Sequence, residues 1–232
     1  MGHVFVRGAV LGDVGRLVEL NHAAYPDLVE DGVVFDAAQL TAQLAVFPEG
    51  QRVAVLDGRV VGSIATLIVP SARALAPHTW GSITSQGTFA CHDPRGDVLY
   101  LADVYADPAA AGRGVGPALY EALFDLCARK GLARVVAGGR LWGYHEVAGE
   151  MTAQAYADDV IGGARRDRVL TSQLRAGFSV AGILDGYLDD WRSGGYATHL
   201  VWENERAARS LSRSRSRSAA EASRNDPTRR SS

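Results

Sequence analysis

The chain has 232 residues, of which 47% are hydrophobic and 22% are charged. This composition is typical of a soluble globular protein with one large domain or two small ones. The net charge of −2 hides an asymmetry, because residues 1–203 carry −7 and residues 204–232 carry +5. A body this acidic lacks the clustered basic face of a nucleic-acid-binding protein, so we expect no specific nucleic-acid partner.

The sequence shows no membrane or export signal. It has no run of 18 apolar residues, and residues 1–7 do not join a basic segment to an apolar one. Cys91 and Cys127 form no CxxC pair, which argues against a disulfide scaffold and favours a reducing compartment. His145-Glu146 is not followed by the second histidine of an HExxH zinc motif. We therefore expect a cytoplasmic protein with no membrane contact and no metal site.

Apolar periodicity and turn residues predict the elements of the first half of the chain. Asp57-Gly58 is typical of a tight hairpin turn, because glycine adopts positive φ freely. Residues 70–97 show no period and contain many Pro, Gly, Ser and Thr residues, so we predict an irregular insertion there. The predicted elements are a strand over Val4–Arg7, helices beginning near Asp13 and spanning Asp36–Phe47, and strands over Val53–Leu56 and Val60–Val69.

The second half predicts a strand–helix–strand unit, which implies a parallel strand pair joined by a right-handed crossover. The whole pattern predicts an α/β (α+β) domain over residues 1–203. Residues 204–232 are rich in Arg and Ser and poor in apolar side chains, which predicts a disordered tail. The predicted strands are Val98–Tyr105, Ala133–Ala137, Phe178–Leu184 and Thr198–Trp202, and the predicted helices are Gly116–Lys130, Thr152–Ile161 and Asp167–Ala176.

A glycine-rich turn connects the strand that ends at Tyr105 to the following helix. It reads Asp107-Pro-Ala-Ala-Ala-Gly-Arg-Gly-Val-Gly-Pro-Ala-Leu119. Successive backbone N–H groups in such a turn, with the positive end of the helix dipole, form an anion site suited to a pyrophosphate. Pro117 stands where a Walker loop needs Lys, and Leu119 stands where a dinucleotide fingerprint needs Gly or Ala. The turn therefore predicts a phosphate ligand of another kind.

The segment Arg113-Gly114-Val115-Gly116-Pro117-Ala118-Leu119 resembles the acetyl-CoA loop of the GNAT N-acyltransferase superfamily, and the order of elements agrees over roughly residues 4–202. The resemblance implies a GNAT-like mixed central sheet flanked by helices, with a splayed parallel strand pair that receives acetyl-CoA as co-substrate. Ala111 departs from the family, which usually has Gln or Arg there. The implied cofactor-binding residues are Val104, Tyr105, Ala111, Gly112, Arg113, Gly114, Val115, Gly116 and Ala118.

Further motifs resemble one branch of that superfamily, whose members often accompany a nitrilase-type carbon–nitrogen hydrolase. They are the runs 137–145, 167–170 and 173–178, together with Thr79-Trp80 and Ile83-Thr84 in the predicted insertion. On this resemblance we assign Trp80 and Thr84 to substrate binding. Arg140 is a candidate for binding a substrate carboxylate, and a structural ion pair is the alternative reading.

Acyl transfer from a thioester to an amine needs a neutral amine and a protonated leaving group. An alkyl amine is about 99.9% protonated at pH 7, so a base is required. Asp103 is the best-placed base, on the strand that lines the thioester in GNAT enzymes, and pairing with an arginine is its alternative role. Many members use a Tyr as acid where this chain has Gln173, so Tyr144 and His145 are the substitute acids.

The favoured function is an N-acetyltransferase that transfers an acyl group from acetyl-CoA to the amine of a small metabolite, by direct transfer with general acid and base assistance. Acylation of a protein N-terminus or lysine is the alternative enzyme. A non-catalytic acyl-CoA-binding module is the alternative class, because Gln173 and Ala111 depart from the family pattern. The partner expected is the small-molecule amine, and homodimerisation is left open.

Overall fold

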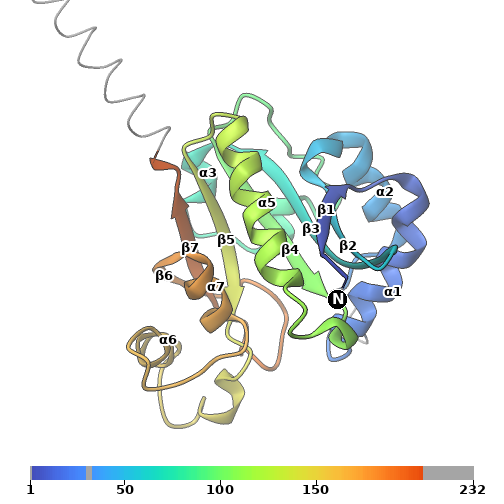
Figure 1. Ribbon diagram of the computed structural model, residues 1–232. Helices are drawn as coiled ribbons and strands as arrows, with labels where there is room; N and C mark the ends of the chain where they lie inside the picture. Colours follow the sequence, from blue (N-terminus) through green and yellow to red (C-terminus); the bar gives the residue numbers. More distant parts are fainter. Residues whose placement is uncertain (1, 30–32, 206–232) are drawn as a thin grey trace, which may run out of the picture.

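Within residues 2–29 and 33–205, which the computed structural model describes, seven strands form one sheet in the order β1-β2-β3-β4-β5-β7-β6 (Figure 1). The neighbouring strands of this sheet are antiparallel except β4 and β5, which run parallel. The strands are β1 (Phe5–Gly8), β2 (Arg52–Leu56), β3 (Arg59–Val69), β4 (Val98–Ala106), β5 (Arg134–Arg140), β6 (Ser179–Leu184) and β7 (Ala197–Glu203).

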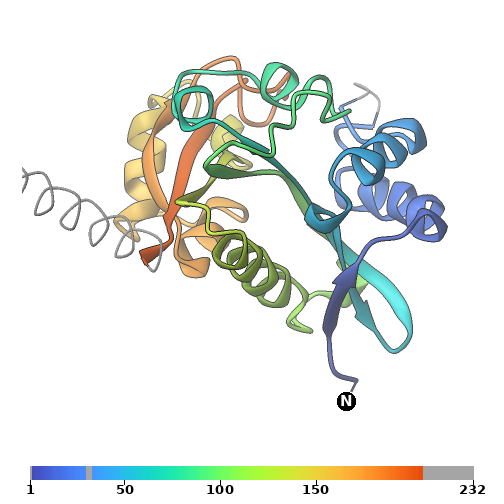
Figure 2. The same ribbon diagram turned by 90° about the horizontal axis from the view of Figure 1, so that it is seen from above.

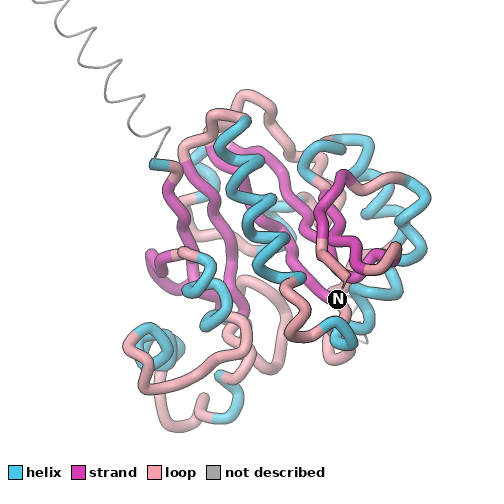
Figure 3. The backbone as a smooth tube through the Cα atoms, viewed as in Figure 1, coloured by secondary structure: helices cyan, strands magenta, loops and turns pink. Residues whose placement is uncertain are grey.

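Helices cover both faces of the sheet, as the view from above shows (Figure 2). The core under α5, α6 and α7 contains Leu119 and Leu123, whereas the core under α1, α2, α3 and α4 contains Leu17 and Ile83. Figure 3 shows the same elements coloured by type. The helices are α1 (Val14–Ala24), α2 (Ala37–Val46), α3 (Ser71–Ala74), α4 (Trp80–Thr84), α5 (Val115–Arg129), α6 (Ala153–Ile161) and α7 (Leu170–Ala176).

The parallel pairing between β4 and β5 ends part-way along both strands. It runs from Val98 opposite Arg134 to Leu101 opposite Ala137. Beyond that point β4 continues to pair with β3, and β5 continues to pair with β7 as far as Arg140. The two strands therefore diverge, which confirms the splayed pair that the sequence resemblance implies.

A bulge lies at the point where the strands diverge. Ala65 pairs with Asp103 and Thr66 pairs with Leu101, so Ala102 is an extra residue on β4. A bulge of this kind changes which side of the sheet the next side chain faces. Ala102 packs with the α1-side core, and Asp103 also reaches α1, where it forms hydrogen bonds. Two consecutive side chains of β4 thus face the same side.

The predicted elements are all present, with ends that differ by up to three residues from those expected. The hairpin turn is confirmed, with φ of +51° at Asp57 and +75° at Gly58. Helix α7 begins at Leu170 rather than at Asp167, because the Asp167 carboxylate accepts the N–H groups of Val169 and Leu170 at 2.8 Å. Asp167 therefore closes the turn that precedes the helix.

The insertion at 70–97 is more ordered than predicted, since it contains α3 and α4. Thr79 caps α4 by accepting the N–H of Ser82 at 3.1 Å. The Trp80 N–H donates to the Tyr187 carbonyl at 2.7 Å, which ties the insertion to the loop between β6 and β7. The predicted disordered tail falls, from residue 206 onward, outside the described residues.

Helix α5 is the main hydrophobic support of the sheet, and Leu123 on it is fully buried. We expect Leu123→Ala to lower the free energy of unfolding by about 2–5 kcal/mol, because it removes buried methyl groups and leaves a cavity. Urea denaturation measures the change. Glu121→Ala on the exposed side of the same helix is the control, and an equal loss in both variants would contradict the assigned packing.

Candidate active site

A cavity of about 330 Å³ occupies the space where β4 and β5 diverge. On one face of the sheet, Tyr120 of α5 and Gln173 of α7 line it. On the other face it is lined by Tyr25 after α1, Trp80 of α4 and Tyr187 in the loop after β6. The cavity therefore joins the two faces of the sheet through the gap between the strands.

The glycine-rich turn leads into α5 at the β4 end of this cavity. Gly112 and Gly114 have φ of +74° and +83°, which favours glycine at both positions. The first α-helical hydrogen bond runs from the Ala118 N–H to the Gly114 carbonyl at 3.2 Å. Helix geometry consequently leaves the N–H groups of Val115 and Gly116 without intrahelical acceptors, available to an anion.

Charged side chains shape and flank the turn. The Asp107 carboxylate accepts the Ala109 N–H at 2.9 Å and an Arg16 N–H at 2.8 Å. Arg113 is exposed and lies 3.7 Å from Asp57 of the hairpin turn. A long, weakly paired guanidinium of this kind is free to contact a phosphate. Ala111, also exposed, offers only its backbone.

Strand β4 supplies one wall of the cavity. Val104 and Tyr105, predicted to contact the cofactor, both line it. The carbonyl oxygen of Val104 lies 2.9 Å from the Tyr25 hydroxyl, and the buried Tyr105 hydroxyl lies 3.4 Å from the Leu17 carbonyl oxygen. The strand is thereby fixed against α1 on one side while its backbone borders the cavity.

Asp103 lies half-buried in the cavity wall. Among the described residues it is the only acidic side chain that lines the cavity. Its Oδ1 accepts a hydrogen bond from the Tyr25 hydroxyl at 2.7 Å, and its Oδ2 accepts one from Asn21 Nδ2 at 2.9 Å. Burial raises the pKa of Asp103 to about 6, although these two donors act against the shift. The carboxyl can therefore accept a proton near neutral pH.

Asn21 and Tyr25, which the sequence analysis did not single out, hold Asp103 in place. Asn21 is buried, and its Oδ1 accepts the Phe35 N–H at 2.9 Å, which fixes the amide so that Nδ2 faces the carboxylate. The two residues are four apart around the end of α1, a spacing that places side chains on one helix face. That spacing is the only signal in the sequence that could have found them.

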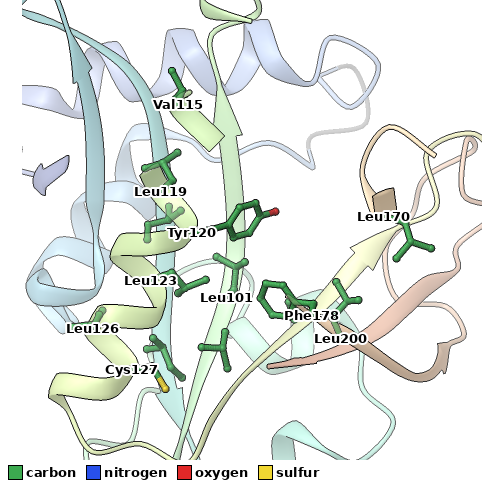
Figure 4. Packing of buried hydrophobic residues seen from close by; sticks show 14 of the residues in the cluster. Leu101, Val115, Leu119, Tyr120, Leu123, Leu126, Cys127, Leu170, Phe178 and Leu200 are labelled. Carbon is green, nitrogen blue, oxygen red and sulfur yellow. The ribbon is translucent and has the colours of Figure 1, made fainter. Parts of the chain in front are cut away.

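Tyr120 is a second residue that the sequence analysis missed. Its ring is 8% exposed and lines the cavity from α5. Figure 4 shows its hydroxyl pointing away from the helix, across β4 and toward β5. Burial raises the pKa of Tyr120 to about 12, with an opposing contribution from Ser172. The phenol is therefore protonated at neutral pH and can donate a proton or a hydrogen bond.

The structure does not bring the predicted acids Tyr144 and His145 to the cavity. Tyr144 is buried in the α5-side core, and its hydroxyl donates to the Met151 carbonyl at 3.0 Å. The His145 ring packs against Trp142 and Trp191, and its Nε2 lies 3.4 Å from Arg192 Nη1. Because neither residue lines the cavity, their expected role is corrected to packing of the loop after β5.

Arg140 lines the cavity, but its guanidinium is held by two carboxylates. It forms two hydrogen bonds to Asp190, one of them 2.6 Å long, and a further ion pair with Asp27. Burial alone would raise the pKa of Asp190, but the hydrogen bonds from Arg140 and Ser193, together with the charge of Arg140 and the Arg192 backbone N–H, lower that pKa. This geometry favours the structural ion pair over a substrate-binding role.

Trp80 and Thr84, both predicted to bind substrate, have different positions. Trp80 lines the cavity, and its indole N–H donates to the carbonyl of the bulge residue Ala102 at 3.1 Å. Thr84 is fully buried, with its hydroxyl donating to the Trp80 carbonyl at 2.6 Å and accepting the Gly87 N–H at 3.0 Å. Thr84 therefore closes the turn after α4 and does not face the cavity.

Comparisons with known proteins agree with this geometry. The model of the acetyltransferase (GNAT) family matches residues 16–146. The uncharacterised N-acetyltransferase YkwB of Bacillus subtilis is 32% identical over 199 residues, which cover 86% of this chain and 88% of YkwB. The chain belongs to the GNAT acetyltransferase family. It is accordingly an acyltransferase with acetyl-CoA as its co-substrate, as the sequence resemblance implies.

Further relatives place the chain within the GNAT fold. It is 34% identical to the probable hydrolase YhcX of Bacillus subtilis, covering 83% of this chain but only 37% of YhcX. The GNAT-like decarboxylase GphF, solved with isobutyryl-CoA, matches with a TM-score of 0.72 and 25% identity over 85% of this chain and 98% of GphF. YncA of Salmonella typhimurium, solved with acetyl-CoA, matches with a TM-score of 0.53 and 18% identity over 86% and 93%.

The environment of Asp103 predicts how stability depends on pH. Its pKa rises on folding from 3.8 to about 6, so the folded state binds more protons between these values and loses stability as pH increases through them. Asp103→Asn removes this loss. We expect the stability of the variant relative to wild type to increase by up to about 3 kcal/mol between pH 4 and pH 7.

Urea unfolding at several pH values measures this difference. The control is Asp185→Asn, which changes an exposed carboxyl outside the cavity. A difference between Asp103→Asn and wild type that stays flat across the range would contradict the buried setting of this carboxyl.

The Arg140 ion pairs predict a second stability effect. We expect Arg140→Met to lower the free energy of unfolding by about 3–5 kcal/mol, because Asp190 would be left buried without its partner. Arg165→Met is the matched control, since its ion pair with Asp159 is partly exposed and should contribute under about 1 kcal/mol. Unchanged stability of Arg140→Met would contradict a structural role of the ion pairs and would favour substrate binding by Arg140.

Proposed function

We propose that this GNAT enzyme transfers the acetyl group of acetyl-CoA to the amine of a small molecule. The observation that carries the proposal is the position of Asp103, a half-buried carboxyl with a pKa of about 6 in the wall of a cavity that joins the two faces of the sheet. The volume of about 330 Å³ supports a small acceptor. Acylation of a protein N-terminus or lysine is the alternative, and it would need a groove open to a peptide.

The proposed cofactor contacts follow the glycine-rich turn and β4. The N–H groups of Val115 and Gly116 would bind the pyrophosphate, with Arg113 adding a charge and Gly112 and Gly114 keeping the turn open. The backbone beside Val104 and Tyr105 would border the pantetheine arm. Ala111 and Ala118 would contribute only backbone and packing contacts at the two ends of the turn.

Asp103 and Tyr120 are the proposed proton-transfer groups. Asp103 would take the proton that the nitrogen loses as the C–N bond forms, and Tyr120 would give a proton to the sulfur as the C–S bond breaks. The high pKa of Tyr120 keeps it protonated for this step. Asp103 would then carry the proton from the nitrogen while Tyr120 lacks the one given to the sulfur, and transfer of a proton from Asp103 to Tyr120 restores the site.

A second candidate is decarboxylation of a carboxyacyl-CoA. The likeness to GphF, with a higher TM-score than YncA, favours it, as does Gln173 in place of the usual acid. In such a reaction the C–C bond to the carboxylate breaks, CO₂ leaves, and the α-carbon takes up a proton. Of the two arginines that line this cavity, Arg140 is already paired with Asp27 and Asp190, which argues against its capture of a further carboxylate. Arg168 lies over the Trp142 ring and is the guanidinium that would receive the carboxylate in this second reaction.

The location and assembly of the protein stay as predicted from the sequence. Cys91 and Cys127 are free thiols, which is compatible with the cytoplasm. Within residues 2–29 and 33–205, the helices are too short or too polar to cross a bilayer. We propose a cytoplasmic enzyme, with homodimerisation open to measurement by sedimentation.

Binding of acetyl-CoA should raise the melting temperature, with a stabilisation of about 2.7 kcal/mol at a hundredfold excess over Kd. We expect Gly114→Glu to abolish this shift, because it places a negative charge at the anion site. Gly114→Asn is the control: asparagine tolerates positive φ, and a Cβ at this position meets no atom within 4 Å. If both variants or neither of them lose the increase in melting temperature, the pyrophosphate does not bind at this turn.

Turnover is tested by thiol release from acetyl-CoA with a panel of amines, read together with the mass of the acylated product. We expect kcat to rise as pH passes through 6 and Asp103 ionises, and Asp103→Asn to lose this rise and roughly 10²-fold in kcat. Tyr120→Phe should also lower kcat with little change in acetyl-CoA binding. Wild-type rates in both variants would contradict the assignment.

Malonyl-CoA separates the two candidate reactions. Loss of CO₂ from malonyl-CoA without an amine, seen as conversion to acetyl-CoA by mass, would favour the decarboxylase. Thiol release that requires an amine would favour the acetyltransferase. Binding of acetyl-CoA with neither reaction would identify the chain as an acyl-CoA-binding module.

A further inference from the structure

Three side chains from distant parts of the chain form a continuous hydrogen-bonded row beside the cavity. His78 of the insertion has its Nε2 2.8 Å from the hydroxyl of Tyr100 on β4. The Tyr100 hydroxyl lies 2.9 Å from the hydroxyl of Tyr187, in the loop after β6. The sequence analysis singled out none of these residues, because sequence spacing gives no sign that they meet.

The row connects the cavity with the surface of the insertion. Tyr187 lines the cavity, Tyr100 is fully buried, and His78 is partly exposed. The end of the Tyr187 ring lies against Gly138, the first residue of β5 beyond the paired segment, where an added Cβ would come within 2.1 Å of the ring. The inner end of the row therefore lies where β4 and β5 begin to diverge.

The hydrogen bonds of His78 fix the direction of the row. Its Nδ1 lies 2.8 Å from the Ala76 carbonyl oxygen, which can only accept, so Nδ1 carries the proton of the neutral ring. Nε2 is then an acceptor, and the Tyr100 hydroxyl donates to it. The Tyr100 oxygen in turn accepts from Tyr187, which lines the cavity and whose oxygen keeps lone pairs that can accept a proton.

The charges around His78 favour this neutral, accepting form. The side chains that face it are Tyr100 of β4, Tyr187, His199 of β7 and Arg73 of α3. Burial lowers the pKa of His78, and the nearby His199 and Arg73 lower it further, although the Ala76 carbonyl opposes the shift. A proton that reaches His78 is therefore passed on readily to water at the surface.

The reaction proposed above produces one proton that the site must discard. An amine arrives mostly as an ammonium ion and becomes an amide, so its nitrogen loses two protons in all. One of these protons goes to Asp103 and balances the proton that Tyr120 gives to the leaving sulfur. The other has no acceptor in the products and must reach solvent.

We propose that Tyr187, Tyr100 and His78 form a relay that carries this proton from the ammonium group to the surface. In one concerted shift, the ammonium proton moves to the Tyr187 oxygen, the Tyr187 proton to Tyr100, and the Tyr100 proton to His78 Nε2. Each hydroxyl gains and loses one proton, and the resulting imidazolium of His78 releases a proton to water. This inference rests on the proposed acetyl transfer to an amine.

The kinetic test compares two acceptors of similar size, an alkyl amine that is charged at pH 7 and an aromatic amine that is neutral. We expect Tyr100→Phe and His78→Gln to lower kcat for the alkyl amine by about 10²-fold at pH 7. The loss should shrink as pH rises and the alkyl amine arrives neutral, and kcat for the aromatic amine should stay near wild type. His22→Gln, an exposed histidine outside the cavity, is the control.

Equal losses with both amines would show that Tyr100 and His78 only support the fold, and unchanged rates with both would show that the proton leaves by another route. Either result overturns the relay while leaving the acetyltransferase in place. If the wild-type protein releases no thiol from acetyl-CoA with any amine, the proposed function is wrong. The relay is then also wrong as a step of amine acylation.

Nitrogen-15 NMR of the histidine rings tests the direction of the row without turnover. The His78 signals are assigned by their loss in His78→Gln. We expect the neutral ring to carry its proton on Nδ1, and the Nε2 signal to shift in Tyr100→Phe. A proton on Nε2 of the neutral ring would overturn the relay, because Tyr100 could then no longer donate to His78.

Discussion

The end of pairing between β4 and β5 is the constraint on which the rest of the structure depends. After Leu101 and Ala137 the two strands share no ladder, so the backbone that would have faced a neighbour faces a cavity instead. A sheet tolerates such an interruption only if other contacts hold the separated strands. Here β3 holds one and β7 holds the other, and helices pack against both faces of the sheet.

The state of Asp103 results from a balance between burial and hydrogen bonding. Burial in the cavity wall disfavours the charged form, and the donors Tyr25 and Asn21 favour it. With donors alone the carboxyl would be a poor base, and with burial alone it would stay protonated. Asn21 in α1 and Tyr25 just after it thus adjust the basicity of a residue on β4.

The sequence predicted most of the fold because its signals were local. The Asp57-Gly58 turn, the apolar face of the helix containing Leu123 and the glycine-rich turn each depend on a few neighbouring residues. The family resemblance then supplied the order of strands. Asp103 was predicted as a candidate base because it lies on the strand next to that turn, and it lines the cavity.

The remaining site residues depend on contacts between distant segments. Tyr120 was hidden within an apolar helix pattern, and Tyr25 and Tyr187 reach the cavity only once α1 and the loop after β6 are placed. Tyr144 failed as a predicted acid for the same reason: its loop begins near the cavity, but its side chain turns into the core. A sequence shows which residues could carry a proton, and packing decides which of them face the substrate.

The hydrogen bond from Trp80 to the Ala102 carbonyl has a consequence for motion in the site. A peptide group is planar, so a contact that fixes this carbonyl also fixes the N–H of Asp103 on the other side of the same plane. The insertion that carries Trp80 contains two short helices, and hydrogen bonds such as those of Trp80 and His78 join it to the rest of the chain. Displacement of that segment would therefore tilt the backbone beside the proposed base, so the position of Asp103 depends on a segment that lies about 20 residues earlier in the sequence.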